Sequence, residues 1–270
     1  MAFDLIGVDF SSRPRARKPI VVALGQRDGG RVSLHGFERF ATLESFGDWL
    51  RAPARWVGGF DLPFGLPRPL VEHLGWPLQW RDCIAHYAAL PRAHVREIFA
   101  AYCAARPAGA KFAHRACDRP AGSSPSMKWV NPPVAYMLHA GVPLLLAAGV
   151  HVPGHAHAGD AQRVALEAYP GLLAREVIGA RSYKSDDPRK HDDERLLARI
   201  AIVDALQEGR TRLALSLAIS APQRDALIDD GSGDALDAVL CLMQAAWACE
   251  QPDFGLPPQL DPLEGWIVSA

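Results

Sequence analysis

Residues 3–10 read FDLIGVDF, a short apolar run that carries an acid, Asp9, near its end. Two more runs follow at once: the β-branched stretch 20–24 (IVVAL) and, after the turn 26–30 (QRDGG), the roughly alternating stretch 31–40 (RVSLHGFERF). Apolar or alternating runs separated by glycine-containing turns are typical of β-strands. The first forty residues therefore predict an antiparallel three-stranded meander that opens a mixed sheet.

The meander is followed by alternating helical and strand patterns. Thr42 is a candidate N-cap for a helix that runs to Leu50, and residues 55–61 (RWVGGFD) predict a fourth strand that stops at the prolines after it. Residues 163–169 (RVALEAY) predict a fifth strand. Right-handed crossovers would place the first and fourth strands side by side. The expected fold class is α/β, a mixed five-stranded sheet flanked by helices.

The remaining segments are expected to be mainly helical. A helix is predicted at 93–105, and Asn131-Pro132-Pro133 predicts the start of another that runs to about Ala148. Further helices are expected at 172–178, 192–207, 211–218 and 234–249, with a last strand at 264–268. We expect a single domain, residues 1–270, with a basic helical insertion at about 68–150, since residues 81–128 hold eight basic and three acidic residues interleaved with aromatics.

Composition excludes several classes of protein. The 270 residues carry a net charge of −1 and contain no apolar run of 18 residues, so no membrane-spanning helix is expected. Asp4 and Asp9 stand where a signal peptide needs a basic start and an apolar core, and no two of the five cysteines have the C-x-x-C spacing. A cytoplasmic location is the expectation. The first 135 residues hold 18 basic and 11 acidic groups and the rest hold 11 and 19, which suggests a basic surface facing an acidic cluster unless the fold interleaves the two halves.

Four aspartates and one glutamate stand at positions where an acid needs a partner. Asp9 and Asp61 end two apolar strands, and burying an unpaired carboxylate costs several kcal/mol. Asp234 and Asp237 share one face of the most apolar helix, and Glu167 lies in the middle of the fifth strand. Simpler interpretations exist: Asp9 as a cap for the loop after it, Asp61 as the start of a turn, Asp234 as a complement to the helix dipole, and Glu167 as a solvated edge residue.

Four motifs join these acids into one ordered pattern. They are Ile6-Gly7-Val8-Asp9, Gly59-Phe60-Asp61-Leu62-Pro63, Leu166-Glu167-Ala168-Tyr169-Pro170 and Gly233-Asp234-Ala235-Leu236-Asp237-Ala238. The set resembles an uncharacterised family of predicted nucleases with the RNase H fold, over most of the chain. The wider superfamily includes Holliday-junction resolvases of the RuvC type. It has an acid on the first strand, another at the end of the fourth, and an aspartate pair three residues apart in a late helix. Asp61 stands where the resolvases have Glu, and Glu167 matches only the uncharacterised family's own pattern.

This resemblance implies a metal-dependent nuclease that hydrolyses phosphodiester bonds of DNA or RNA. Converging carboxylates repel each other unless cations intervene, and oxygen ligands suit Mg²⁺ or Mn²⁺. Two such ions can activate a water and stabilise the leaving oxygen. In this scheme Asp9 bridges both ions, and Asp61 and either Asp234 or Asp237 each complete one site. Glu167 is a ligand or supports one.

A nucleic-acid substrate also needs cations that hold its backbone. Arg13, Arg15, Arg17 and Lys18 follow Asp9 directly and are candidates, unless they form only a solvated hairpin tip. Lys128 and Lys184 are further candidates for contacting the reacting phosphate. Two other functions remain open: a non-catalytic nucleic-acid-binding or structural protein on the same fold, and an actin-like-fold phosphotransferase. The chain fits the second function poorly, because it has neither a glycine-rich turn after the first strand nor a GxxxxGK[ST] motif.

Overall fold

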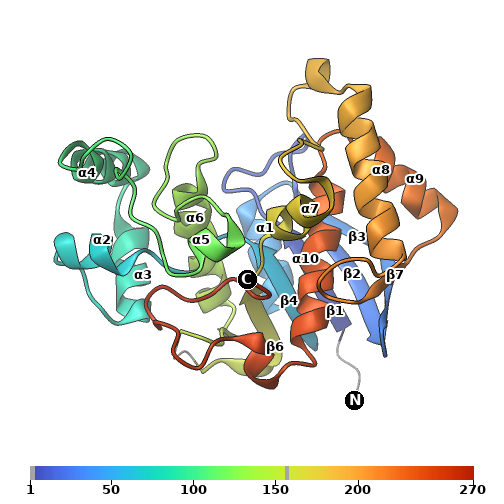
Figure 1. The fold of residues 1–270 in the computed structure, drawn as a ribbon. Coiled ribbons are helices and arrows are strands. Elements are labelled where there is room, and N and C mark those ends of the chain that lie inside the picture. The colour runs from blue at the N-terminus through green and yellow to red at the C-terminus, as the bar shows by residue number, and fades with distance from the viewer. Residues whose placement is uncertain (1–3, 156–157) are drawn as a thin grey trace.

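A seven-stranded mixed sheet forms the centre of the computed structural model, which describes residues 4–155 and 158–270 (Figure 1). The order across the sheet is β5-β6-β4-β1-β2-β3-β7. The strands are β1 (Asp4–Asp9), β2 (Ile20–Asp28), β3 (Arg31–Phe40), β4 (Trp56–Asp61), β5 (Val150–His151), β6 (Asp160–Glu167) and β7 (Ser216–Ala218). The five strands predicted between residues 3 and 169 all form, although Phe3 lies outside the described residues. The expected number of five was wrong, because the short strands β5 and β7 extend the sheet at its two ends.

The pairing of the central strands confirms the meander. β1 pairs with β2 and β2 with β3, both antiparallel. β1 also pairs in parallel with β4, as right-handed crossovers predict, and β4 pairs in parallel with β6. In the β1–β4 register Asp9 lies directly opposite Asp61. The carboxyl ends of three neighbouring parallel strands therefore meet at one edge of the sheet.

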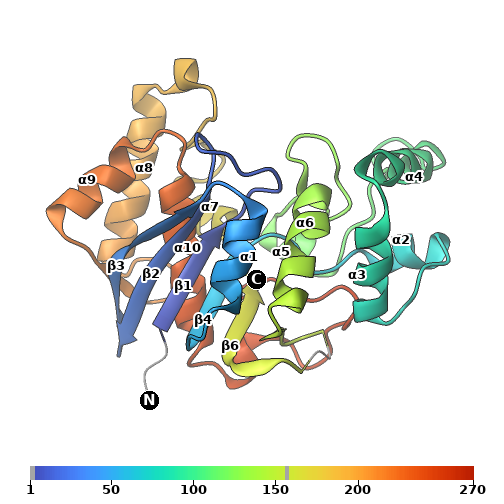
Figure 2. The same cartoon turned by 180° about the vertical axis from the view of Figure 1, so that it is seen from behind.

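Helices cover both faces of this sheet (Figures 1 and 2). In chain order they are α1 (Leu43–Arg51), α2 (Arg68–His73), α3 (Trp80–Ala89), α4 (Arg92–Ala104), α5 (Asp118–Ala121), α6 (Val134–Ala147), α7 (Pro170–Ile178), α8 (Asp193–Gln207), α9 (Ala221–Asp229) and α10 (Asp234–Ala248). Helices α7 to α10 pack with one face of the sheet in one hydrophobic core. Helices α1 and α6 pack on the other face, and α2 to α4 continue this second core away from the sheet.

The predicted N-cap of α1 is confirmed, whereas two other predicted segments were wrong. The Thr42 side chain accepts a hydrogen bond from the Ser45 backbone N–H, as expected of an N-cap. The predicted helix at 211–218 is instead a turn followed by β7, because Ala214 adopts a φ of 51° and residues 216–218 pair with β3. The predicted strand at 264–268 does not form, because Gly265 turns the chain with a φ of 71°.

Two glycines bring α10 into direct contact with the sheet. A Cβ atom on Gly7 of β1 would lie 2.0 Å from the Ala238 carbonyl oxygen, and one on Gly59 of β4 would lie 2.4 Å from the Cys241 carbonyl oxygen. Only residues without a side chain permit this approach of strand and helix backbones. The first turn of α10 is thereby held beside the carboxyl ends of β1 and β4.

None of the helices in the described ranges is long and apolar enough to cross a lipid bilayer.

Candidate metal centre

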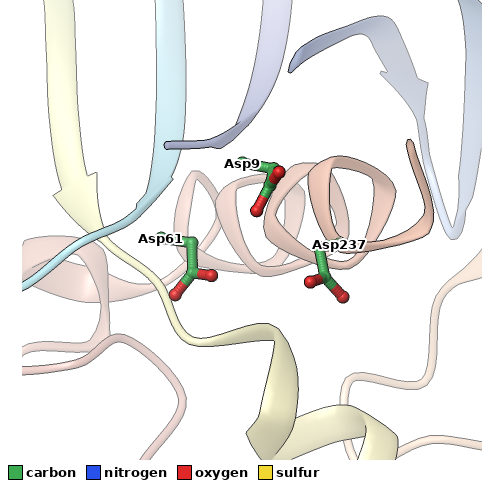
Figure 3. Close-up of side chains that lie close together, drawn as sticks. All are labelled: Asp9, Asp61 and Asp237. Carbon is green, nitrogen blue, oxygen red and sulfur yellow. The ribbon is translucent and has the colours of Figure 1, made fainter. Parts of the chain in front are cut away.

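Three aspartate carboxylates converge where β1, β4 and α10 meet. Asp9 ends β1, Asp61 ends β4, and Asp237 lies in the first turn of α10. One oxygen from each of the three lies within 4.8 Å of the others, and the side chains point into a common space (Figure 3). Asp237 is fully buried and Asp9 is 8% exposed. This set of three oxygen donors could hold a metal ion.

Burial and mutual repulsion raise the pKa values of the three carboxyl groups of the triad. Burial raises the pKa of Asp9 well above its usual value, and the neighbouring Asp237 carboxylate raises it further. The same two causes, burial and the charge of Asp237, raise the pKa of Asp61 to about 7. Burial also raises the pKa of Asp237, although Lys184 partly opposes the shift. A bound divalent cation would offset the repulsion and the desolvation together.

Two side chains of the segment after α7 contact Asp237 directly. The Tyr183 hydroxyl donates a hydrogen bond to one carboxylate oxygen, and the Lys184 ammonium forms an ion pair with the other. Burial opposes the charge on Lys184, but Asp237 and the other anionic groups around it outweigh this and raise the lysine pKa. Lys184 is therefore the cation that the chain itself supplies to the triad.

Asp234, the other half of the helical pair, lies outside the triad. Its carboxylate accepts a hydrogen bond from Lys18, at 2.7 Å, and the side chain is 8% exposed. Lys18 also forms an ion pair with Asp186, at 2.6 Å. The lysine therefore ties the loop after β1 to α10 and to the segment after α7.

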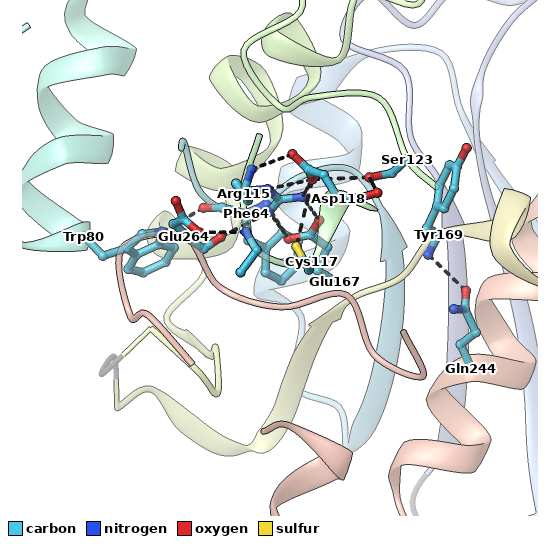
Figure 4. A network of polar contacts seen from close by, with 11 residues as sticks. Phe64, Trp80, Arg115, Cys117, Asp118, Ser123, Glu167, Tyr169, Gln244 and Glu264 are labelled. Carbon is cyan, nitrogen blue, oxygen red and sulfur yellow. Dashed lines mark hydrogen bonds and ion pairs between the residues drawn. The ribbon is translucent and has the colours of Figure 1, made fainter. Parts of the chain in front are cut away.

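Glu167 is held in a buried network (Figure 4) and is not part of the triad. Its carboxylate forms an ion pair with Arg115 at 2.6 Å and accepts a hydrogen bond from the Phe64 backbone N–H at 2.9 Å. Arg115 also pairs with Asp118 and donates to the Glu264 carbonyl oxygen. Burial raises the pKa of Glu167, and the charge of Arg115 opposes this shift. The network joins β6, the insertion and the C-terminal segment beside the triad.

A cleft of about 820 Å³ opens over these acids. Asp9, Asp61 and Glu167 line it, together with residues of the loop after β1, the start of α6, and the segment from Tyr169 to Lys184. Its cationic lining comprises Arg13, Arg15, Lys18, Arg115, Arg175, Arg181 and Lys184. Four of the six candidate substrate-binding residues, Arg13, Arg15, Lys18 and Lys184, are thus brought together at the cleft. The other two, Arg17 and Lys128, are not among the lining residues.

Several residues of the site were not singled out from the sequence. Arg115 lies in the insertion, where the excess of basic residues was noted but no single arginine could be chosen. Arg175 and Arg181 flank the C-terminal end of α7 and look like ordinary surface arginines in the sequence. Tyr183 directly precedes Lys184, a candidate phosphate-contacting residue, and this adjacency is the signal in the sequence that points to Tyr183.

The comparisons with known proteins identify a family and nothing more specific. No curated protein and no solved structure matches the chain. The model of one family, described as a protein of unknown function (DUF429), matches residues 7–257 and so includes all three aspartates of the triad. The chain belongs to this DUF429 family of proteins of unknown function.

Proposed function

We propose that this protein is a metal-dependent nuclease that hydrolyses phosphodiester bonds at the Asp9–Asp61–Asp237 triad. The observation that carries the proposal is the convergence of three carboxylates within 4.8 Å, two of which, Asp9 and Asp61, line a cleft with many cationic side chains. The fold supports it, because the acids stand at the end of the first strand, at the end of the fourth predicted strand and in the late helix. The resemblance to RNase H-like nucleases implied the same layout.

The donor set fits a hard divalent cation. The three converging donors are carboxylate oxygens, and oxygen ligands favour Mg²⁺ or Mn²⁺ over softer metals. Asp9, Asp61 and Asp237 would hold the ion, and their raised pKa values reflect the charge that it would neutralise. When bound, such an ion supplies Lewis acidity toward a phosphate oxygen and lowers the pKa of a water molecule. A second ion would require Asp234 to be released from Lys18.

The chain's own residues would position the phosphodiester. Lys184 lies at the triad and carries the charge that can stabilise a phosphate oxygen once it leaves Asp237. Tyr183 fixes the orientation of the Asp237 carboxylate through its hydroxyl hydrogen bond. Arg13 and Arg15 are exposed on the loop that follows Asp9 and would contact phosphates on either side of the reacting one.

Incubation with labelled nucleic acids tests this proposal. Wild type, Asp9→Asn and Asp4→Asn are each mixed with single-stranded and duplex DNA and RNA, with Mg²⁺, Mn²⁺ or EDTA. Asp4 is an exposed acid on the same strand, so Asp4→Asn is the matched control. We expect cleavage by wild type and Asp4→Asn in the presence of a divalent ion, and none by Asp9→Asn or in EDTA. Cleavage that persists in Asp9→Asn would contradict the proposal, and so would a failure of wild type to cleave any of the four substrates.

A further inference from the structure

The shape and lining of the cleft indicate which form of nucleic acid reaches the triad. We propose that the cleft binds a single strand, with unpaired bases against its apolar wall and phosphates along its arginines. This inference rests on the proposed nuclease function and specifies its substrate.

The burial of the triad is the first observation that favours a single strand over a duplex. Asp9 and Asp61 line the cleft, Asp9 is only 8% exposed, and Asp237 beside them is fully buried, so a phosphodiester must enter the cleft to reach the triad. The cleft volume of about 820 Å³ lies within the range of about 300–1,000 Å³ that encloses drug-sized ligands. A short stretch of one strand fits such a space. A rigid double helix, whose base pairs fill its interior, binds instead across broad protein faces of about 1,000–2,500 Å².

The apolar and aromatic side chains that line the cleft are the second observation that favours a single strand. Pro132 and Pro133 are exposed at its edge, and the partly buried side chains of Met137 and Tyr169 also line it. The guanidinium of Arg175 lies 5.2 Å from the centre of the Tyr169 ring, which gives a planar cationic–aromatic surface. In a duplex the flat faces of the bases are stacked on each other, and only a single strand can offer them to such a wall.

The third observation is that some cationic side chains of the cleft are paired with acids and others are not. Lys18, Arg115 and Lys184 of the cleft are each paired with a buried acid. Within the described part of the chain, Arg13, Arg15, Arg175 and Arg181 form no ion pair with a carboxylate, and all four are exposed. Arg175 and Arg181 donate to backbone carbonyl oxygens instead. These four arginines line the same cleft as Asp9 and Asp61 and are available to phosphates there.

A binding experiment that does not depend on metal or cleavage tests the inference. Fluorescence anisotropy with Asp9→Asn in EDTA would compare labelled twelve-residue oligothymidylate, oligouridylate and a blunt twelve-base-pair DNA duplex. We expect at least one single strand to bind at least tenfold more tightly than the duplex. Either sugar supports the inference, and the two single-stranded arms distinguish DNA from RNA.

Matched variants locate the binding to the cleft. In the same background, Arg13→Ala with Arg15→Ala should reduce the slope of log K against log [salt] by about 1.4, since each phosphate contact on a single strand contributes about 0.7. Arg17→Ala is the control, because Arg17 lies on the same loop and is exposed but is not among the cleft-lining residues. Tyr169→Leu, checked for folding by its thermal transition, should weaken single-strand binding by at least fivefold.

Three results would overturn the inference: duplex binding as tight as that of both single strands, an unchanged salt slope after the double arginine substitution, or displacement of the oligonucleotides by equimolar thymidine 5′-monophosphate. The last would indicate a small-molecule site. Because binding is measured without metal, none of these results depends on whether the protein cleaves nucleic acid.

Discussion

Replacing Gly7 by alanine should separate α10 from the sheet and disrupt the metal site from a distance. The added Cβ would lie 2.0 Å from the Ala238 carbonyl oxygen and 2.2 Å from the Leu242 backbone nitrogen. Ordinary contacts begin at 3.4 Å, so the strand and helix backbones must move apart by about 1.4 Å. Overpacking of this kind typically costs about 1–3 kcal/mol of unfolding free energy. Asp237 precedes Ala238 and would move with it, whereas metal–oxygen distances tolerate only about 0.2 Å.

The test combines urea denaturation with calorimetric titration of Mn²⁺. We expect Gly7→Ala to lose about 1–3 kcal/mol of unfolding free energy and about 10- to 100-fold in Mn²⁺ affinity. Gly36→Ala is the matched control, because Gly36 lies on β3 of the same sheet, where an added Cβ would meet no atom within 4 Å. Its stability and affinity should equal or slightly exceed those of wild type. Wild-type stability and affinity in Gly7→Ala would refute the claim that close packing of α10 positions Asp237.

Three further predictions follow from the buried charges. Arg115→Met should destabilise the protein by about 3–5 kcal/mol in urea denaturation, because it leaves Glu167 and Asp118 buried without their cation; a loss below 1 kcal/mol would contradict this account. Since the pKa of Asp61 is raised from its ordinary 3.8 to about 7, the folded state binds a proton more tightly than the unfolded state, and the metal-free unfolding free energy should fall as pH rises between these values, by at most about 4 kcal/mol. Asp61→Asn should flatten that part of the pH profile, and an unchanged profile would be the opposing result. Mn²⁺ at 100 times its Kd should stabilise wild type by about 2.7 kcal/mol, which a thermal melt would record as a Tm rise of about 5–10 °C that EDTA reverses.

The strands of the central sheet could be predicted because each carries a strong local signal. The runs at β1 to β4 and β6 are apolar or alternating, and a glycine or proline closely follows β2 and β4. β7 has three residues and β5 two, and both exist through pairing with a neighbour rather than through their own sequence. The helix expected at 211–218 fails for the same reason, since its last residues pair with β3.

The acids of the site could be found from the sequence, but their partners could not. An aspartate at the end of an apolar strand or in an apolar helix is conspicuous, and Asp9, Asp61 and Asp237 do converge. Asp234 and Glu167 carry the same local signal, and their lysine and arginine partners lie 216 and 52 residues away along the chain. Local pattern does not report such long-range pairing, so it could not separate triad members from acids paired to a cation.

Calorimetric titration of Mn²⁺ into wild type, Asp237→Asn and Asp234→Asn tests the central claim most directly. The two substitutions remove equal charge from the same helix turn, but only Asp237 belongs to the triad. The account predicts saturable Mn²⁺ binding by wild type, a loss of at least tenfold in affinity for Asp237→Asn, and affinity within about threefold of wild type for Asp234→Asn. Equal loss in the two variants, or no Mn²⁺ binding by wild type, would contradict a metal centre at Asp9, Asp61 and Asp237.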